Sequence, residues 1–126
     1  MLHGIDTVNY FTPTTDPKID FSKVDVLSLL MLERARSISK IVFKITSHYR
    51  IPDHSVDVGG SMTDAHTRIP CGAFDIAYSN SKDLYMILDG VVRAGFKRIG
   101  VNNHNFHVHV DNESSDHFPS PRFWIE

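Results

Sequence analysis

Eight of the 126 residues are histidines, and three of them, His104, His107 and His109, fall within six positions. The segment from Phe106 to Asp111 alternates apolar and polar residues, which is typical of a strand. Because side chains alternate across a strand, His107 and His109 project to the same side, where two imidazoles can bind one metal ion. The spacing alone leaves open which of these two histidines is the ligand.

A third ligand must come from elsewhere in the chain. His66 and Asp75 are the best-placed candidates, because one ends a long loop and the other lies on a short strand. Two imidazoles and one carboxylate leave the fourth position of a tetrahedral zinc ion open to water, which is the catalytic pattern rather than the structural one. The alternative is that these are exposed or hydrogen-bonded polar groups without a metal. The other histidines show no such pattern and are expected at the surface, namely His3, His48, His54 and His117.

Periodicity and capping residues predict the elements that position these side chains. Helices are predicted at 23–38 and 82–93, and strands at 41–46, 73–77, 96–101 and 106–111. Ser22 and Ser81 are the expected N-caps and Gly95 the expected C-terminal cap. The polar segment 48–68 is predicted to be a long irregular loop, and the last fifteen residues a tail laid over the domain.

Apolar residues predict which faces of these elements are buried. The first helix is expected to bury Val24, Leu27, Leu30 or Met31, and Ala35. The second is expected to bury Leu84, Ile87, Leu88, Val91 and Val92. The last strand is expected to bury Phe106, Val108 and Val110. Mixed helices and strands of this kind predict an α+β fold.

Composition limits the class of protein. With 41% hydrophobic and 22% charged residues, the chain is expected to form one soluble globular domain over residues 1–126. Its net charge of −2, without a basic stripe, argues against a nucleic-acid partner. The longest nearly uncharged apolar stretch, Val26–Leu32, is far short of the roughly 20 residues of a membrane helix, so no membrane insertion is expected. The single cysteine, Cys71, excludes an internal disulfide.

Several short motifs follow one another in a recognisable order. They are Ser47-His48-Tyr49-Arg50, Val58-Gly59-Gly60, Asp64-Ala65-His66, Gly72-Ala73-Phe74-Asp75-Ile76 and His104-Asn105-Phe106-His107-Val108-His109-Val110-Asp111. Over about residues 22–111 this order resembles the zinc peptidases of the M15 family. That family includes D-alanyl-D-alanine carboxypeptidases and phage endolysins, and it shares its fold with the hedgehog signalling domain. The resemblance implies a small antiparallel sheet with helices packed on one side.

The resemblance also implies a set of zinc ligands, His66, Asp75 and His109, with Arg50 holding the substrate. The family usually places six residues between the first two ligands, whereas eight separate His66 and Asp75 here. The extra residues around Thr67 to Cys71 are expected to form a longer loop. Asp64, two residues before His66, takes the usual serine position and is a less favoured candidate for the second ligand than Asp75.

Roles beside the metal follow from the same comparison. His104 resembles the catalytic histidine of the carboxypeptidase branch and would move the proton between water and the leaving amine, because an imidazole titrates near neutral pH. His107 lies beside the metal and would donate to the developing oxyanion, although the two roles can be exchanged. Asp111 could orient His109 through a hydrogen bond, and a strand-end charge is the alternative.

These roles together imply zinc-dependent hydrolysis of peptidoglycan stem peptides, with a D,D-type enzyme favoured. The first residues show no signal peptide, so we expect synthesis in the cytoplasm and, for a phage or prophage lysin, action on the cell wall after release. We expect a monomer. The alternative is a non-catalytic zinc-containing binding module on the same scaffold.

Overall fold

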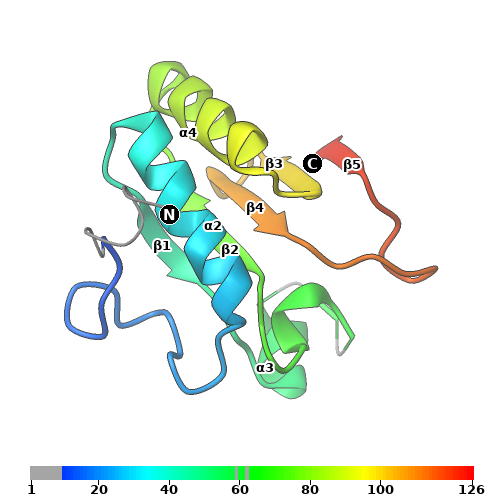
Figure 1. Ribbon diagram of the computed structural model, residues 1–126. Coiled ribbons are helices and arrows are strands. Elements are labelled where there is room, and N and C mark those ends of the chain that lie inside the picture. The colour runs from blue at the N-terminus through cyan, green and yellow to red at the C-terminus, as the bar shows by residue number, and fades with distance from the viewer. Residues whose placement is uncertain (1–9, 59, 62) are drawn as a thin grey trace.

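A five-stranded sheet packs against two long helices (Figure 1). The computed structural model of the protein describes residues 10–58, 60–61 and 63–126. Its helices are α2 (Val26–Ser39), α3 (Pro52–Asp57) and α4 (Ser81–Ala94), with a 3-10 turn η1 at Ala65–Thr67. Its strands are β1 (Lys44–Ser47), β2 (Phe74–Ala77), β3 (Arg98–Asn102), β4 (His107–Asp111) and β5 (Arg122–Ile125).

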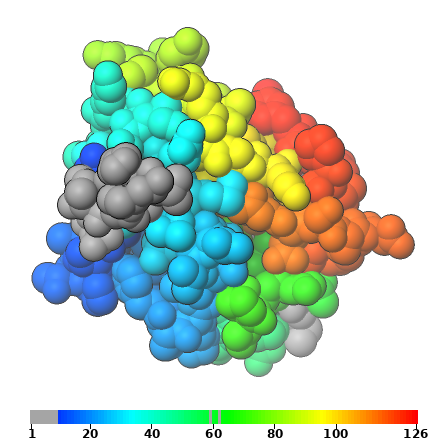
Figure 2. Space-filling view, viewed as in Figure 1, coloured from blue at the N-terminus to red at the C-terminus, as the bar shows by residue number. Residues whose placement is uncertain are grey.

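The strand order is β1-β2-β4-β3-β5, and every neighbouring pair is antiparallel except β3 with β5. Helices α2 and α4 pack against each other over one side of the sheet (Figure 1). In the space-filling view from the same side, their side chains cover the middle of the molecule (Figure 2). The expected α+β fold, with a mostly antiparallel sheet and helices on one side, is confirmed.

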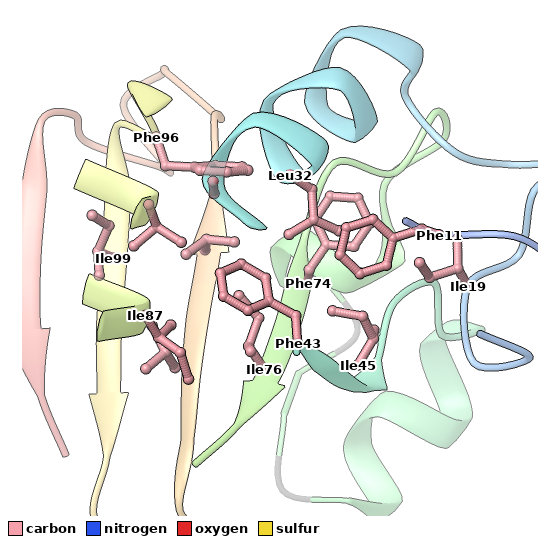
Figure 3. Packing of buried hydrophobic residues seen from close by; sticks show 14 residues of the cluster. Phe11, Ile19, Leu32, Phe43, Ile45, Phe74, Ile76, Ile87, Phe96 and Ile99 are labelled. Atoms are coloured by element: carbon pink, nitrogen blue, oxygen red, sulfur yellow. The ribbon is translucent and has the colours of Figure 1, made fainter. Parts of the chain in front are cut away.

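The pleat of β2 and β4 separates the core from the site. Phe74, Ile76, Val108 and Val110 are fully buried and lie within the core cluster that includes residues of α2 and α4, part of which Figure 3 shows. The alternating residues of the same strands therefore project from the opposite face of the sheet. Asp75 and the polar residues of β4 lie on that face.

Helix α2 begins and packs differently from the expectation. Asp25 is its N-cap and accepts a hydrogen bond from the Ser28 backbone N–H at 3.1 Å. Ser22, the predicted cap, instead donates from its backbone and hydroxyl to Asp20. The buried face runs along one side of the helix and consists of Ser28, Leu32, Glu33, Ala35 and Ser39. Leu27 was predicted to be buried but is 71% exposed, because the contacting face is rotated relative to the apolar residues.

Small residues on the contacting faces let α2 and α4 approach closely. A Cβ at Gly90 would lie 2.5 Å from the Ala35 carbonyl oxygen, so a larger residue would push the two helices apart. Helix α4 is otherwise as predicted, and Gly95 ends it with φ of 98°. Its N-cap is Asn80 rather than Ser81, and Val92 of the predicted stripe is 59% exposed.

Three further predictions are corrected by the structure. The segment 48–68 contains helix α3 and turn η1 rather than only irregular loop. The C-terminal tail contains strand β5, which pairs with β3. Phe106 precedes β4 in a turn with φ of 56° and is 56% exposed, so it does not join Val108 and Val110 in the core.

Leu32 provides a test of the helix–sheet packing. Replacing the fully buried Leu32 by alanine is expected to lower the free energy of unfolding by about 2–5 kcal/mol, because a cavity is left beneath α2. The matched variant Leu27→Ala, on the exposed side of the same helix, is expected to change it by less than about 0.5 kcal/mol. Urea unfolding followed by circular dichroism measures both, and equal losses would contradict the observed helix orientation.

Candidate metal centre

Three ligand atoms meet on the face of the sheet opposite α2 and α4. His66 Nε2, Asp75 Oδ1 and His109 Nδ1 lie 3.1 Å from one another on all three sides. They come from η1, β2 and β4, which are far apart in the sequence. His66 and Asp75 are buried, and His109 is partly exposed. The structure thus brings together the three residues that the resemblance implies as ligands.

The geometry of this triangle fits a zinc ion. Tetrahedral zinc with bonds of about 2.0–2.1 Å separates neighbouring ligand atoms by about 3.3 Å. The observed separations of 3.1 Å are close to that value. Two imidazole nitrogens and one carboxylate oxygen also match the donor set of catalytic zinc sites, which keep a fourth position open.

Backbone contacts on both sides hold His66 in place. Its Nδ1–H donates to the His48 carbonyl oxygen at 2.5 Å, which leaves the Nε2 lone pair for the metal. Asp64 is the N-cap of η1 and accepts from the His66 backbone N–H at 3.0 Å. The Asp64 carboxylate also binds Arg50 and Ser55, so Asp64 supports the site and does not replace Asp75 as a ligand.

Strand pairing brings Asp75 and His109 together. They are directly opposite each other in the antiparallel pairing of β2 and β4. His109 Nε2–H donates to Asp111 Oδ2 at 2.6 Å, which turns Nδ1 toward Asp75 and His66. His66 and His109 thus offer different ring nitrogens to the metal. Asp111, the residue expected to orient His109, is hydrogen-bonded to it, and the Asp111 side chain is 1% exposed.

The candidate ligands change one another's pKa values. Burial raises the pKa of Asp75, but the neighbouring His66 and His109 outweigh it and hold the pKa well below its usual range. Burial lowers the pKa of His109, but hydrogen bonds to Asp111 and Asp75 outweigh this and raise it to about 9. In the metal-free protein at neutral pH, Asp75 is therefore ionised and His109 carries a proton that zinc must displace.

Zinc binding is therefore expected to release at least one proton per ion near pH 7.5, namely the proton of His109. Because His109 has a pKa of about 9, the proton competes less as the pH rises, and the dissociation constant should fall toward that pH. The expected slope is at least ~10-fold per pH unit between pH 7 and 8, because one released proton gives that value. Calorimetry in buffers of different ionisation enthalpy counts the protons, and chelator competition gives the slope. A dissociation constant independent of pH would contradict a protonated His109.

The two proposed catalytic histidines lie at different distances from the cluster. His107 is on β4, two residues before His109, and its Nε2 lies 3.7 Å from Asp75 Oδ2. His104 is exposed in the turn between β3 and β4, where its backbone N–H donates to Asn102 Oδ1. The described contacts do not join the His104 ring to the cluster.

A cavity of about 340 Å³ opens onto the ligands. Arg50, which the resemblance implies as the substrate-binding residue, lines it, and its side chain is 15% exposed. Arg98, Phe118 and Trp124 also line it, although no motif in the sequence indicates that they belong to the site. Strand alternation could have found Arg98, which pairs directly with Asp111 across β3 and β4.

Trp124 reaches the cavity across β3. A Cβ at Gly100 would lie 2.3 Å from Trp124 Cε2, so glycine is needed for the indole to lie over this strand. The indole also lies near the His109 ring, with a centroid separation of 5.7 Å. The C-terminal strand therefore forms one wall of the site.

His48 was predicted at the surface but is 1% exposed. Its ring accepts from the Asp20 backbone N–H through Nδ1 and donates from Nε2 to the Cys71 carbonyl, so both nitrogens are satisfied in the interior. Burial raises the pKa of the Cys71 thiol to about 12, which keeps it neutral.

His54 and His117 are exposed as expected, whereas His3 lies outside the described residues.

Comparison with protein families agrees with this site. A family model described as Peptidase M15 matches residues 9–111, which include Arg50, all three ligands and both candidate catalytic histidines. No curated protein and no solved structure matches the chain. In the part of the chain that the structure describes, no helix is long and apolar enough to span a membrane. From the matched family and the ligand triangle together, we conclude that the chain belongs to the peptidase M15 family of zinc metallopeptidases.

Proposed function

We propose that this peptidase cleaves the stem peptides of peptidoglycan, as a D,D-type carboxypeptidase or endopeptidase. The observation that carries the proposal is the position of Arg50, which lines the same cavity as the three zinc ligands. A guanidinium presents a planar fork that suits a carboxylate. A stem peptide offers such a group at its C-terminus or on an inner residue, near the bond to be cut.

Arg50 is held in a fixed orientation for this role. Its Nη2 donates to Asp64 Oδ2 at 3.2 Å, and the same oxygen accepts from the Ser55 hydroxyl at 2.6 Å. Burial raises the pKa of Asp64, but hydrogen bonds from Ser55 and Ser61 and the charge of Arg50 outweigh this and lower it. Asp64 is thus ionised, and it fixes the guanidinium while other donors of Arg50 stay available to a substrate.

In the proposed reaction, water adds to the carbonyl carbon, the C–N bond breaks, and a carboxylate and an amine leave. His66, Asp75 and His109 would hold the zinc ion, which would supply Lewis-acid chemistry and a water nucleophile near neutral pH. His104 takes the proton from water and returns it to the leaving amine. His107, whose ring lies beside Asp75, donates a hydrogen bond to the carbonyl oxygen as negative charge develops there.

The substrate class can be tested with defined peptides. Zinc-loaded protein is incubated with a stem pentapeptide ending in D-Ala-D-Ala and with purified cross-linked muropeptides, and the products are identified by mass spectrometry. We expect loss of one alanine from the pentapeptide or cleavage of the cross-link. Amidation of the pentapeptide C-terminus removes the carboxylate and should lower kcat/KM if Arg50 binds it. Intact peptides in every reaction would contradict the proposed substrate.

A further inference from the structure

A buried ion pair lies directly behind one zinc ligand. Asp111 Oδ2 is 2.6 Å from His109 Nε2, and Asp111 Oδ1 is 2.9 Å from Arg98 Nε. The side chain of Asp111 is 1% exposed and that of Arg98 is 11% exposed. Arg98, Asp111 and His109 therefore form a continuous chain of polar contacts that ends at the metal site.

The rest of the Arg98 side chain is fixed by the C-terminal segment. Its Nη1 donates to the Pro119 carbonyl oxygen at 2.8 Å. Its guanidinium carbon lies 5.3 Å from the centroid of the Phe118 ring and 5.2 Å from that of Trp124. Such cation–π contacts stabilise a desolvated guanidinium. Arg98 is thus held by residues of the C-terminal segment, none of which is a zinc ligand.

Asp111 depends on Arg98 for its position. A buried carboxylate is costly unless it is paired with a charge and hydrogen-bonded. Besides His109, its described partners are Arg98 and the Glu113 backbone N–H, both of which contact Oδ1. The Arg98 Nε–H is not well aligned with that oxygen, so the contact is mainly a charge–charge interaction. With Oδ1 held in this way, Oδ2 faces His109.

We propose that Arg98 is a positioning residue of the zinc site, which acts through Asp111 to keep His109 Nδ1 directed at the metal. Strand pairing supports this role, because Arg98 lies directly opposite Asp111 and Gly100 directly opposite His109. This role of Arg98 affects zinc affinity and is independent of which peptide bond the enzyme cuts. The C-terminal segment then also contributes to the zinc site, because its residues hold the Arg98 side chain in place.

The test is a double-mutant cycle on zinc affinity. Arg98→Gln and Asp111→Asn are each expected to raise the zinc dissociation constant by about 10–100-fold, the usual effect of losing a group that orients a ligand. If Arg98 acts through Asp111, the double variant should bind zinc no more weakly than Asp111→Asn alone. Additive losses, or an unchanged dissociation constant in Arg98→Gln, would overturn the proposal.

Two further variants separate positioning from general destabilisation. Arg98→Lys keeps the charge beside Asp111 and should hold the zinc dissociation constant within a few-fold of the parent value. This variant also tests the proposal if Arg98→Gln does not fold. Arg122→Gln removes an exposed arginine from β5 and should leave zinc binding unchanged. Zinc binding as weak in Arg98→Lys as in Asp111→Asn would overturn the proposal. Circular dichroism of each metal-free variant shows whether the fold is retained.

Discussion

Replacing His66 by alanine is expected to remove both tight zinc binding and hydrolysis. His66 supplies one corner of the ligand triangle, and only Asp75 and His109 would remain. The loss in zinc affinity should exceed the roughly 10–100-fold typical of residues that merely orient a ligand. Metal content after gel filtration, chelator competition and peptide hydrolysis measure the effect. A chelator should inactivate the parent protein in the same way, and added zinc should restore the parent but not the variant.

The matched control is His54→Ala. His54 is exposed on α3, outside the described cavity, so the variant should keep its zinc and its activity. Unfolding of metal-free His66→Ala and parent protein shows whether the loss is local. Full zinc content and full activity in His66→Ala would contradict the proposed ligand set.

The second large effect is expected at the two histidines that are not ligands. His104→Ala should lower kcat by about 10²–10⁴-fold, the usual contribution of a general acid–base group. His107→Ala should lower it by about 10²–10³-fold, the cost of losing one hydrogen bond to a developing oxyanion. Both variants should retain stoichiometric zinc, because neither ring contributes to the ligand triangle. Retained activity in both variants would contradict the roles given to the two histidines, whereas a zinc-loaded parent protein without any hydrolytic activity would favour the non-catalytic zinc module.

The pH dependence assigns the two roles. The acidic limb of the kcat/KM profile reports protonation of the general base. It should disappear in His104→Ala and persist in His107→Ala. The opposite result would exchange the two roles, and the position of the His107 ring beside Asp75 makes that a well-defined alternative. Zinc content measured at each pH separates loss of the base from loss of the metal.

Local patterns in the sequence predicted much of the site. The alternation over residues 106–111 correctly placed His107, His109 and Asp111 on one face, because the period of a strand is independent of its neighbours. It failed at Phe106, where the chain enters a turn with positive φ. The position of Asp75 opposite His109 depends on pairing between distant strands. Periodicity alone does not encode that pairing, and the resemblance to the M15 family supplied it.

Other elements depend on contacts that a local pattern does not contain. The segment of strand β5 follows two prolines, and its sequence predicts only a tail laid over the domain. The strand forms because it pairs in parallel with β3. Pro52 lies in the segment predicted to be an irregular loop but stands at the start of α3, where its missing N–H costs no hydrogen bond. His48 resembled a surface residue because its polar ring gives no sign of the partners that satisfy it inside the fold.

An anomalous difference map from crystals of the zinc-saturated protein, recorded at the zinc absorption edge, measures the metal position most directly. We expect one peak per chain, bonded to His66 Nε2, Asp75 Oδ1 and His109 Nδ1 at about 2.0–2.2 Å, with a non-protein ligand in the fourth position. A peak at other side chains, or no peak between these three in zinc-saturated crystals, would contradict the account.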